Sequence, residues 1–145
     1  MSISLYTYVY YLAALVACGL GFWKGDAPLR ITSVVTIISW SITPLLGHWD
    51  GEALNVPQTL VDAVTTVAYI LISLRFRRLW TVVLSALALL IVLCPFVDLA
   101  DARVHRNSWI AANNILAVCQ IAVLCVVLWL TIRARRRADE SALRP

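Results

Sequence analysis

The stretch LISLRFRRLWTVV, Leu71 to Val83, places three arginines between two apolar segments. The segment that ends within it, Val56–Leu74, and the segment that begins within it, Leu79–Val97, are each 19 residues long. A helix needs about 20 apolar residues to cross the hydrocarbon core of a bilayer, which is roughly 30 Å thick. Only a tight turn fits between the two segments, so we predict an antiparallel pair of membrane-spanning helices.

Three further apolar segments extend this pattern along the chain: Ile3–Trp23, Ile31–Gly47 and Ser108–Ile132. Of the 145 residues, 61% are hydrophobic and 14% are charged, whereas a soluble domain is about 45–50% apolar and about 25% charged. The predicted fold class is therefore an all-α integral membrane protein, a compact bundle of five transmembrane helices. We expect one domain over residues 1–132 and a basic, partly disordered cytoplasmic tail over residues 133–145.

The basic residues divide unequally between the two sides of the membrane when five crossings are assumed. Ten of the twelve lysines and arginines then fall on one side and two on the other, and short cytoplasmic loops are enriched in these residues. We therefore predict an inner-membrane protein with its N-terminus outside and its C-terminus in the cytoplasm. The ten are Lys24, Arg30, Arg75, Arg77, Arg78, Arg133, Arg135, Arg136, Arg137 and Arg144, and the two are Arg103 and Arg106.

The segment Ile31–Gly47 has only 17 residues and could instead be a re-entrant or interfacial helix. Without its crossing, Lys24 and Arg30 would lie opposite the arginines of the Arg75–Arg78 turn, which weakens the charge bias. The tryptophans at both predicted interfaces also agree with five crossings. The predicted basic face should attract anionic lipid by about 1 kcal/mol per basic residue near the surface.

Polar and small side chains recur at helical spacing along the predicted spans. Lipid tails offer no hydrogen bonds, so such side chains usually face other helices. We expect the second, third and fifth segments to form the inner seam, with the fourth more exposed to lipid or to a partner. The predicted helix-packing stripe comprises Thr32, Thr36, Ser39, Thr43, Gln58, Thr65, Tyr69 and Gln120.

One carboxylate, Asp62, falls inside the third apolar segment, roughly 9 Å along the helix from its outer end. A charge at membrane depth costs at least a few kcal/mol, so we expect Asp62 to be protonated or to have a polar partner. Nearby threonines, outer-loop arginines and asparagines of the fifth segment are candidate partners. The predicted outer-half polar cluster contains Asp62, Asn113, Asn114, His48, Asp98, Asp101 and His105.

Each member of this cluster has an ordinary explanation, such as loop exposure or a helix end. Together, His48, Asp98, Asp101 and His105 could ligate a borderline metal ion, and the histidines could serve a haem. No dense metal-binding motif such as HExxH supports either possibility. We therefore predict no cofactor and no metal.

No catalytic motif is present, since the sequence lacks GxSxG, an intramembrane GxGD and a phosphate-binding glycine loop. The four cysteines form no CxxC pair and are interpreted as packing residues. We therefore predict that the protein is not an enzyme, and that its partners are lipid and protein, not nucleic acid.

Three functions are compatible with these features. The first is a self-associating permeability protein, because the small size, several spans, short loops and basic TIRARRR segment resemble the holins of bacterial viruses. Holins more often have one to three spans, so five is a departure from that pattern. The alternatives are an accessory or interaction subunit of a larger membrane complex, and a proton-, metal- or ligand-handling protein that uses the outer cluster.

Overall fold

A computed structural model describes residues 5–46, 55–100 and 106–142, and these residues form five α-helices and no strand. The all-α prediction is confirmed. The helices are α1 (Leu5–Lys24), α2 (Ala27–Leu46), α3 (Val56–Phe76), α4 (Leu79–Ala100) and α5 (Arg106–Ala142).

Three of these helices contain stretches long and apolar enough to cross a membrane: Val56–Phe76 in α3, Leu79–Val97 in α4 and Ile110–Ser141 in α5. Tyr11–Lys24 in α1 and Ala27–Thr43 in α2 are shorter apolar helices. The structure therefore supports a membrane protein with three candidate spans. Crossing by α1 and α2 stays a prediction from the charge pattern.

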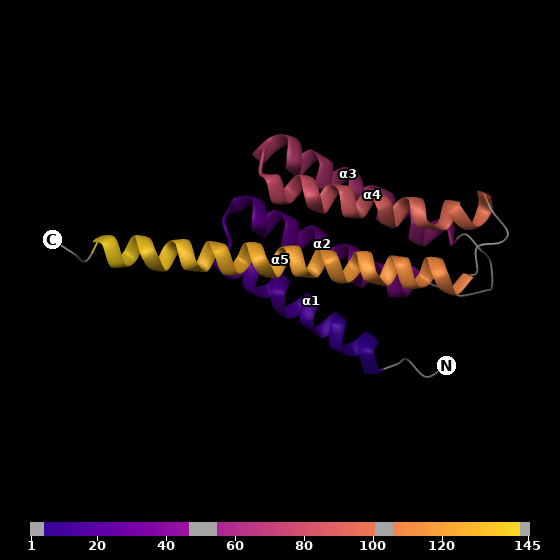
Figure 1. The fold of residues 1–145 in the computed structure, drawn as a ribbon, viewed down its shortest axis with the longest axis horizontal. Helices are drawn as coiled ribbons and strands as arrows, with labels where there is room; N and C mark the ends of the chain where they lie inside the picture. Colours follow the sequence, from indigo (N-terminus) through magenta and orange to yellow (C-terminus); the bar gives the residue numbers. More distant parts are fainter. Residues whose placement is uncertain (1–4, 47–54, 101–105, 143–145) are drawn as a thin grey trace.

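Each helix packs against its neighbours in sequence, and α1 also packs against α5, so the five helices form a closed ring. Figure 1 shows the α1–α2 turn and the α3–α4 turn at the same end of the bundle, the end from which α5 projects. We call this end, with the arginines of those turns and of α5, the basic end. The predicted antiparallel arrangement of α3 and α4 is confirmed.

The starts of α2 and α3 are fixed by capping side chains. The Oδ1 atom of Asn55 accepts a hydrogen bond from the Gln58 amide at 3.2 Å, which makes Asn55 the N-cap of α3. The Oδ1 atom of Asp26 accepts one from the Leu29 amide at 3.3 Å. This second cap, followed by a proline in the first turn, starts α2 at Ala27, four residues before the predicted boundary.

The first two helices approach each other closely along a row of small residues. Ala14, Cys18 and Gly21 follow one another at helical spacing on α1, and all three are buried. A Cβ atom added at Gly21 would lie 2.5 Å from the Oγ atom of Ser33 on α2. Helix contacts built on small residues are typical of membrane bundles, because they let the backbones approach.

The predicted peripheral position of α4 is wrong. This helix packs between α3 and α5 and supplies Leu84 and Ala88 to the buried core, which also includes Leu29 and Tyr69. By contrast, the backbones of α3 and α5 do not approach each other closely within the described residues. In this ring every helix packs against the two beside it, and α2 also contacts α5. Composition alone did not reveal this order.

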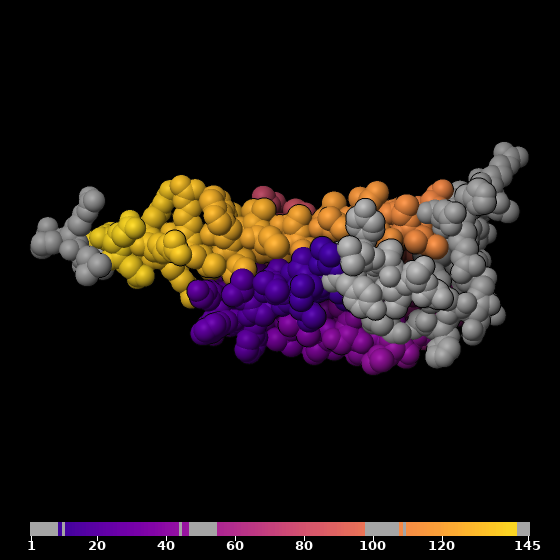
Figure 2. Space-filling view, turned by 90° about the horizontal axis from the view of Figure 1, so that it is seen from below, coloured from indigo at the N-terminus to yellow at the C-terminus, as the bar shows by residue number. Residues whose placement is uncertain are grey.

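The predicted disorder of the tail is also wrong for residues 133–142, which continue α5 as helix. Extending an existing helix needs no new nucleus, and alanine and arginine are good helix formers. At 37 residues, α5 is about 55 Å long, well beyond a bilayer core of roughly 30 Å. Figure 2 shows its C-terminal part extending past the other helices.

Candidate functional site at the basic end

The predicted outer-half cluster is not assembled by the part of the chain that the structure describes. His48, Asp101 and His105 lie outside the described residues, as does the side chain of Asp98. Asp62 on α3 and Asn113 on α5 are half-buried, and Asn114 is exposed. Since α3 and α5 are not neighbours, neither asparagine bonds to Asp62.

No hydrogen bond or ion pair reaches the Asp62 carboxylate from the described residues. Thr66, one helical turn further along α3, donates its hydroxyl to the Asp62 backbone carbonyl at 2.8 Å, not to the carboxylate. Within the same described ranges, no three histidine, cysteine, aspartate or glutamate residues are placed to hold a metal ion.

The predicted packing stripe lies partly in the bundle interior. Thr32, Thr36, Ser39, Tyr69 and Gln120 are buried, whereas Thr43, Gln58 and Thr65 are half-buried. Sequence reasoning missed four buried polar residues. The two residues on α4 were missed because that helix was expected to lie outside the inner seam. Ser33 and Thr66 were missed because each directly follows a residue of the predicted stripe. The four are Ser33, Thr66, Thr81 and Ser85.

A buried hydrogen bond joins α2 to α3 inside this seam. The Thr36 hydroxyl lies 2.7 Å from the Tyr69 hydroxyl and 2.7 Å from the Thr32 carbonyl oxygen. A threonine hydroxyl carries one hydrogen, and a carbonyl oxygen can only accept. Thr36 therefore donates to Thr32, and Tyr69 donates to Thr36.

A small cleft opens between α1 and α2 beside this bond. Its volume is about 160 Å³, and Cys18 and Thr36 contribute to its lining. Tyr11 and Trp40, also in the lining, meet edge to face with their ring centroids 5.4 Å apart. The cleft is mainly apolar.

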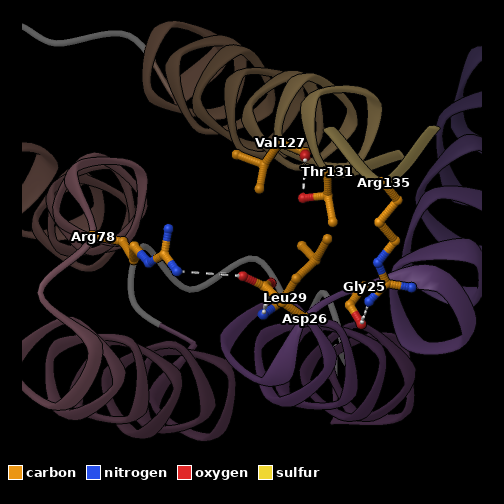
Figure 3. Close-up of polar contacts among 7 residues, drawn as sticks. All are labelled: Gly25, Asp26, Leu29, Arg78, Val127, Thr131 and Arg135. Carbon is orange, nitrogen blue, oxygen red and sulfur yellow. Dashed lines mark hydrogen bonds and ion pairs between the residues drawn. The ribbon is translucent and has the colours of Figure 1, made fainter. Parts of the chain in front are cut away.

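The most concentrated set of polar contacts between distant segments lies at the basic end (Figure 3). The carbonyl oxygen of Gly25, in the α1–α2 turn, accepts a hydrogen bond from Arg30 Nε at 3.0 Å. The same oxygen accepts a second from Arg135 Nη2 at 3.2 Å, although 110 positions separate the two residues in the sequence. These contacts tie the end of α5 to the first helical hairpin.

An ion pair adds the second hairpin to this arrangement. Arg78, between α3 and α4, lies 3.9 Å from the Asp26 carboxylate. Asp26 thus caps α2 with one oxygen and faces Arg78 with the other. Asp26 lies between the two apolar segments predicted at Ile3–Trp23 and Ile31–Gly47, and an aspartate two residues before a proline is a recognisable helix start.

Local backbone constraints explain why the two turns have these residues. A Cβ atom at Gly25 would overlap the Gly21 carbonyl oxygen, to which the Gly25 amide donates a hydrogen bond at 2.9 Å. At the α3–α4 turn, Arg77 adopts a left-handed conformation with φ of 50°, and its amide donates a hydrogen bond to the Ser73 carbonyl oxygen at 2.9 Å. This helix C-cap lets α4 begin two residues later.

Two exposed tryptophans mark the level of the basic end along the bundle. Arg133 lies over the Trp129 ring at 5.1 Å, and Lys24 lies 6.0 Å from the centroid of the Trp23 ring. Both tryptophans are largely exposed. Exposed tryptophan beneath a basic side chain is typical of the boundary between lipid tails and headgroups.

No known family model matches the chain, and no curated protein or solved structure matches it either.

Proposed function

We propose that this protein is a non-catalytic, multi-pass protein of the inner membrane that acts as an accessory subunit of a larger membrane assembly. In this proposal the chain crosses the bilayer five times, with its N-terminus outside and its C-terminus in the cytoplasm. The segment of α5 from Arg133 to Ala142, which we call the basic rod, is the docking element for an acidic protein partner.

The observation that carries this proposal is the continuation of α5 past the bundle as an exposed helix. The described side chains of the basic rod are exposed throughout, and Arg136 and Arg137 make no hydrogen bond or ion pair within the described chain. Apart from the hydrogen bond of Arg135 to the Gly25 carbonyl oxygen, the described part of the rod makes no hydrogen bond or ion pair with the other helices, and a mainly polar helix gains little from packing on its own bundle. Four arginines concentrate positive charge at the start of the rod and outnumber its two acids, Asp139 and Glu140, so the rod favours association with an acidic surface.

A holin-like protein would use Asp62 and the polar stripes of the second and third segments to line or seal an oligomer interface. Thr36 on α2 and Tyr69 on α3 instead bond to each other within one chain. The buried positions on α2 are likewise enclosed by the neighbouring helices. We therefore place the accessory role first and treat pore formation as a competing outcome of the same experiment.

The experiment is purification of the full chain from its native membranes in mild detergent, followed by native mass spectrometry. The informative variant is the charge reversal Arg136→Glu with Arg137→Glu. The matched control is Arg75→Glu with Lys24→Glu, which removes two positive charges at the same end but outside the basic rod. The proposal predicts a second protein in fixed stoichiometry with the wild type and with the control, lost only from the basic-rod variant.

Two outcomes would contradict this assignment. A monomer without any protein partner would argue against an accessory role. A complex that contains only this chain, together with loss of membrane potential on controlled expression, would favour the permeability function.

A further inference from the structure

Two arginines at the basic end converge on one backbone oxygen. Arg30 Nε and Arg135 Nη2 lie 3.0 and 3.2 Å from the Gly25 carbonyl oxygen, so the two nitrogen atoms are separated by no more than the sum of those distances. Like charges held this close repel each other unless an anion lies beside them.

The described part of the chain supplies no carboxylate for this pair. Its one ion pair joins Asp26 to Arg78, and the same aspartate also caps α2. Arg30 and Arg135 are both exposed. A guanidinium carries five N–H donors, and each of these two arginines is seen to use one.

The Gly25 carbonyl also keeps the two side chains in place. Long basic side chains lose conformational freedom when they bind a ligand, and this loss weakens binding. An arginine that is already anchored to a backbone oxygen has less freedom to lose. The remaining N–H donors of both guanidinium groups are therefore held near the α1–α2 turn before a ligand binds.

The depth of the pair indicates which anion it meets. Trp23 and Trp129, which mark the boundary of the lipid tails, lie two residues before Gly25 on α1 and six before Arg135 on α5. The arginine pair thus lies just past this boundary, at the level of the lipid phosphates. Guanidinium groups bind phosphate oxygens in a planar, often bidentate geometry.

We infer that Arg30 and Arg135 form a binding site for the phosphate group of an anionic phospholipid of the cytoplasmic leaflet. The bound phosphate bridges α2 and α5 and supplies the missing negative charge. The site rests on the proposed topology, and Arg135 lies within the basic rod. Arg136 and Arg137, whose charges the partner experiment reverses, are not part of the site, so the two proposals are tested by different variants.

The test measures binding of phosphatidylglycerol to the full chain in nanodiscs of phosphatidylcholine, by lipid-dependent thermal stabilisation and by native mass spectrometry. Arg135→Gln is compared with Arg137→Gln, a variant of the same helix with the same net charge. Both variants lose the same amount of diffuse attraction to the membrane. The ratio of their affinities for phosphatidylglycerol therefore reports the contribution of the site alone. We expect Arg135→Gln and Arg30→Gln to bind about ten-fold more weakly than Arg137→Gln, which corresponds to one charge-assisted hydrogen bond.

Equal affinities of Arg135→Gln and Arg137→Gln would overturn the inference, because the attraction would then be diffuse. Inorganic phosphate is tested in phosphatidylcholine alone, and stabilisation equal to that by phosphatidylglycerol would assign the site to free phosphate instead of lipid. Stability of each variant without phosphatidylglycerol shows whether it folds. The two proposals are distinguished if the basic-rod variant loses a protein partner but still binds phosphatidylglycerol, or if it keeps the partner but no longer binds the lipid.

Discussion

Replacing Gly21 with alanine is expected to displace the buried Ser33 hydroxyl on α2 or to force α1 away from α2, whereas the same replacement at Gly19 is not. The added Cβ atom at Gly21 would lie 2.5 Å from the Ser33 Oγ atom, inside van der Waals contact, while its other neighbours are at 3.6 Å or more. At Gly19, two positions earlier on the same helix, the added atom would meet nothing within 4 Å. Both variants make the same glycine-to-alanine change in the same helix, so a difference in their stability reports the packing around the added Cβ atom.

The magnitude follows from two opposing effects. Alanine favours the helix over glycine by about 0.5–1 kcal/mol at either position. Overpacking of a close contact costs about 1–3 kcal/mol, and only Gly21→Ala incurs it. We therefore expect Gly19→Ala to be neutral or slightly stabilising, and Gly21→Ala to be about 1–3 kcal/mol less stable than Gly19→Ala.

The assay is reversible unfolding of the detergent-solubilised protein by a denaturing detergent, followed by circular dichroism. A double variant, Gly21→Ala with Ser33→Ala, removes the atom that the new Cβ meets and should recover most of the lost stability. Equal stability of the two glycine variants would refute the close approach of α1 and α2. Failure of Ser33→Ala to rescue would show that Ser33 is not the contact.

Three further predictions concern hydrogen bonds and turns, and use the same unfolding assay. Thr36→Val leaves the buried Tyr69 hydroxyl without its acceptor and should cost about 1–3 kcal/mol of stability. Tyr69→Phe should cost only about 0.6 kcal/mol. A larger loss of stability for Tyr69→Phe than for Thr36→Val would contradict Tyr69 as the donor. Asn55→Ala should lose about 1 kcal/mol of helix capping and speed amide exchange at the start of α3, with Asn55→Asp as the conservative control that retains it. Arg77→Gly should raise stability by up to about 1 kcal/mol by relieving the left-handed conformation, and a less stable glycine variant would argue against that backbone geometry.

Much of the helical organisation was predictable because hydrophobic length and turn chemistry are local properties. The alternation of apolar segments with short polar links predicted all five helices. An asparagine two residues before a proline, as at Asn55, is likewise a local signal for the start of a helix. The order of the ring was not predictable, because every segment is apolar enough to be buried or to face lipid. The placement of α4 went wrong for that reason.

The basic end illustrates a different limit. The sequence predicted the accumulation of positive charge but not the convergence of Arg30 and Arg135 on Gly25, because that contact joins residues 110 positions apart. The length of α5 was missed because composition was used to judge the tail, whereas helix propagation from an existing helix decides its structure. The outer-half cluster stays a prediction, since His48, Asp101, His105 and the Asp98 side chain lie outside the described residues.

Lys24, the single lysine of the chain, gives the most direct test of the five-crossing topology. It is exposed, and it lies beside the turn that Arg135 and Arg78 hold at the basic end. A membrane-impermeant amine reagent, followed by peptide mass spectrometry, should modify Lys24 in inside-out vesicles and leave it unmodified in intact cells. Modification of Lys24 in intact cells would place the α1–α2 turn on the outer side of the membrane and contradict the five-crossing topology.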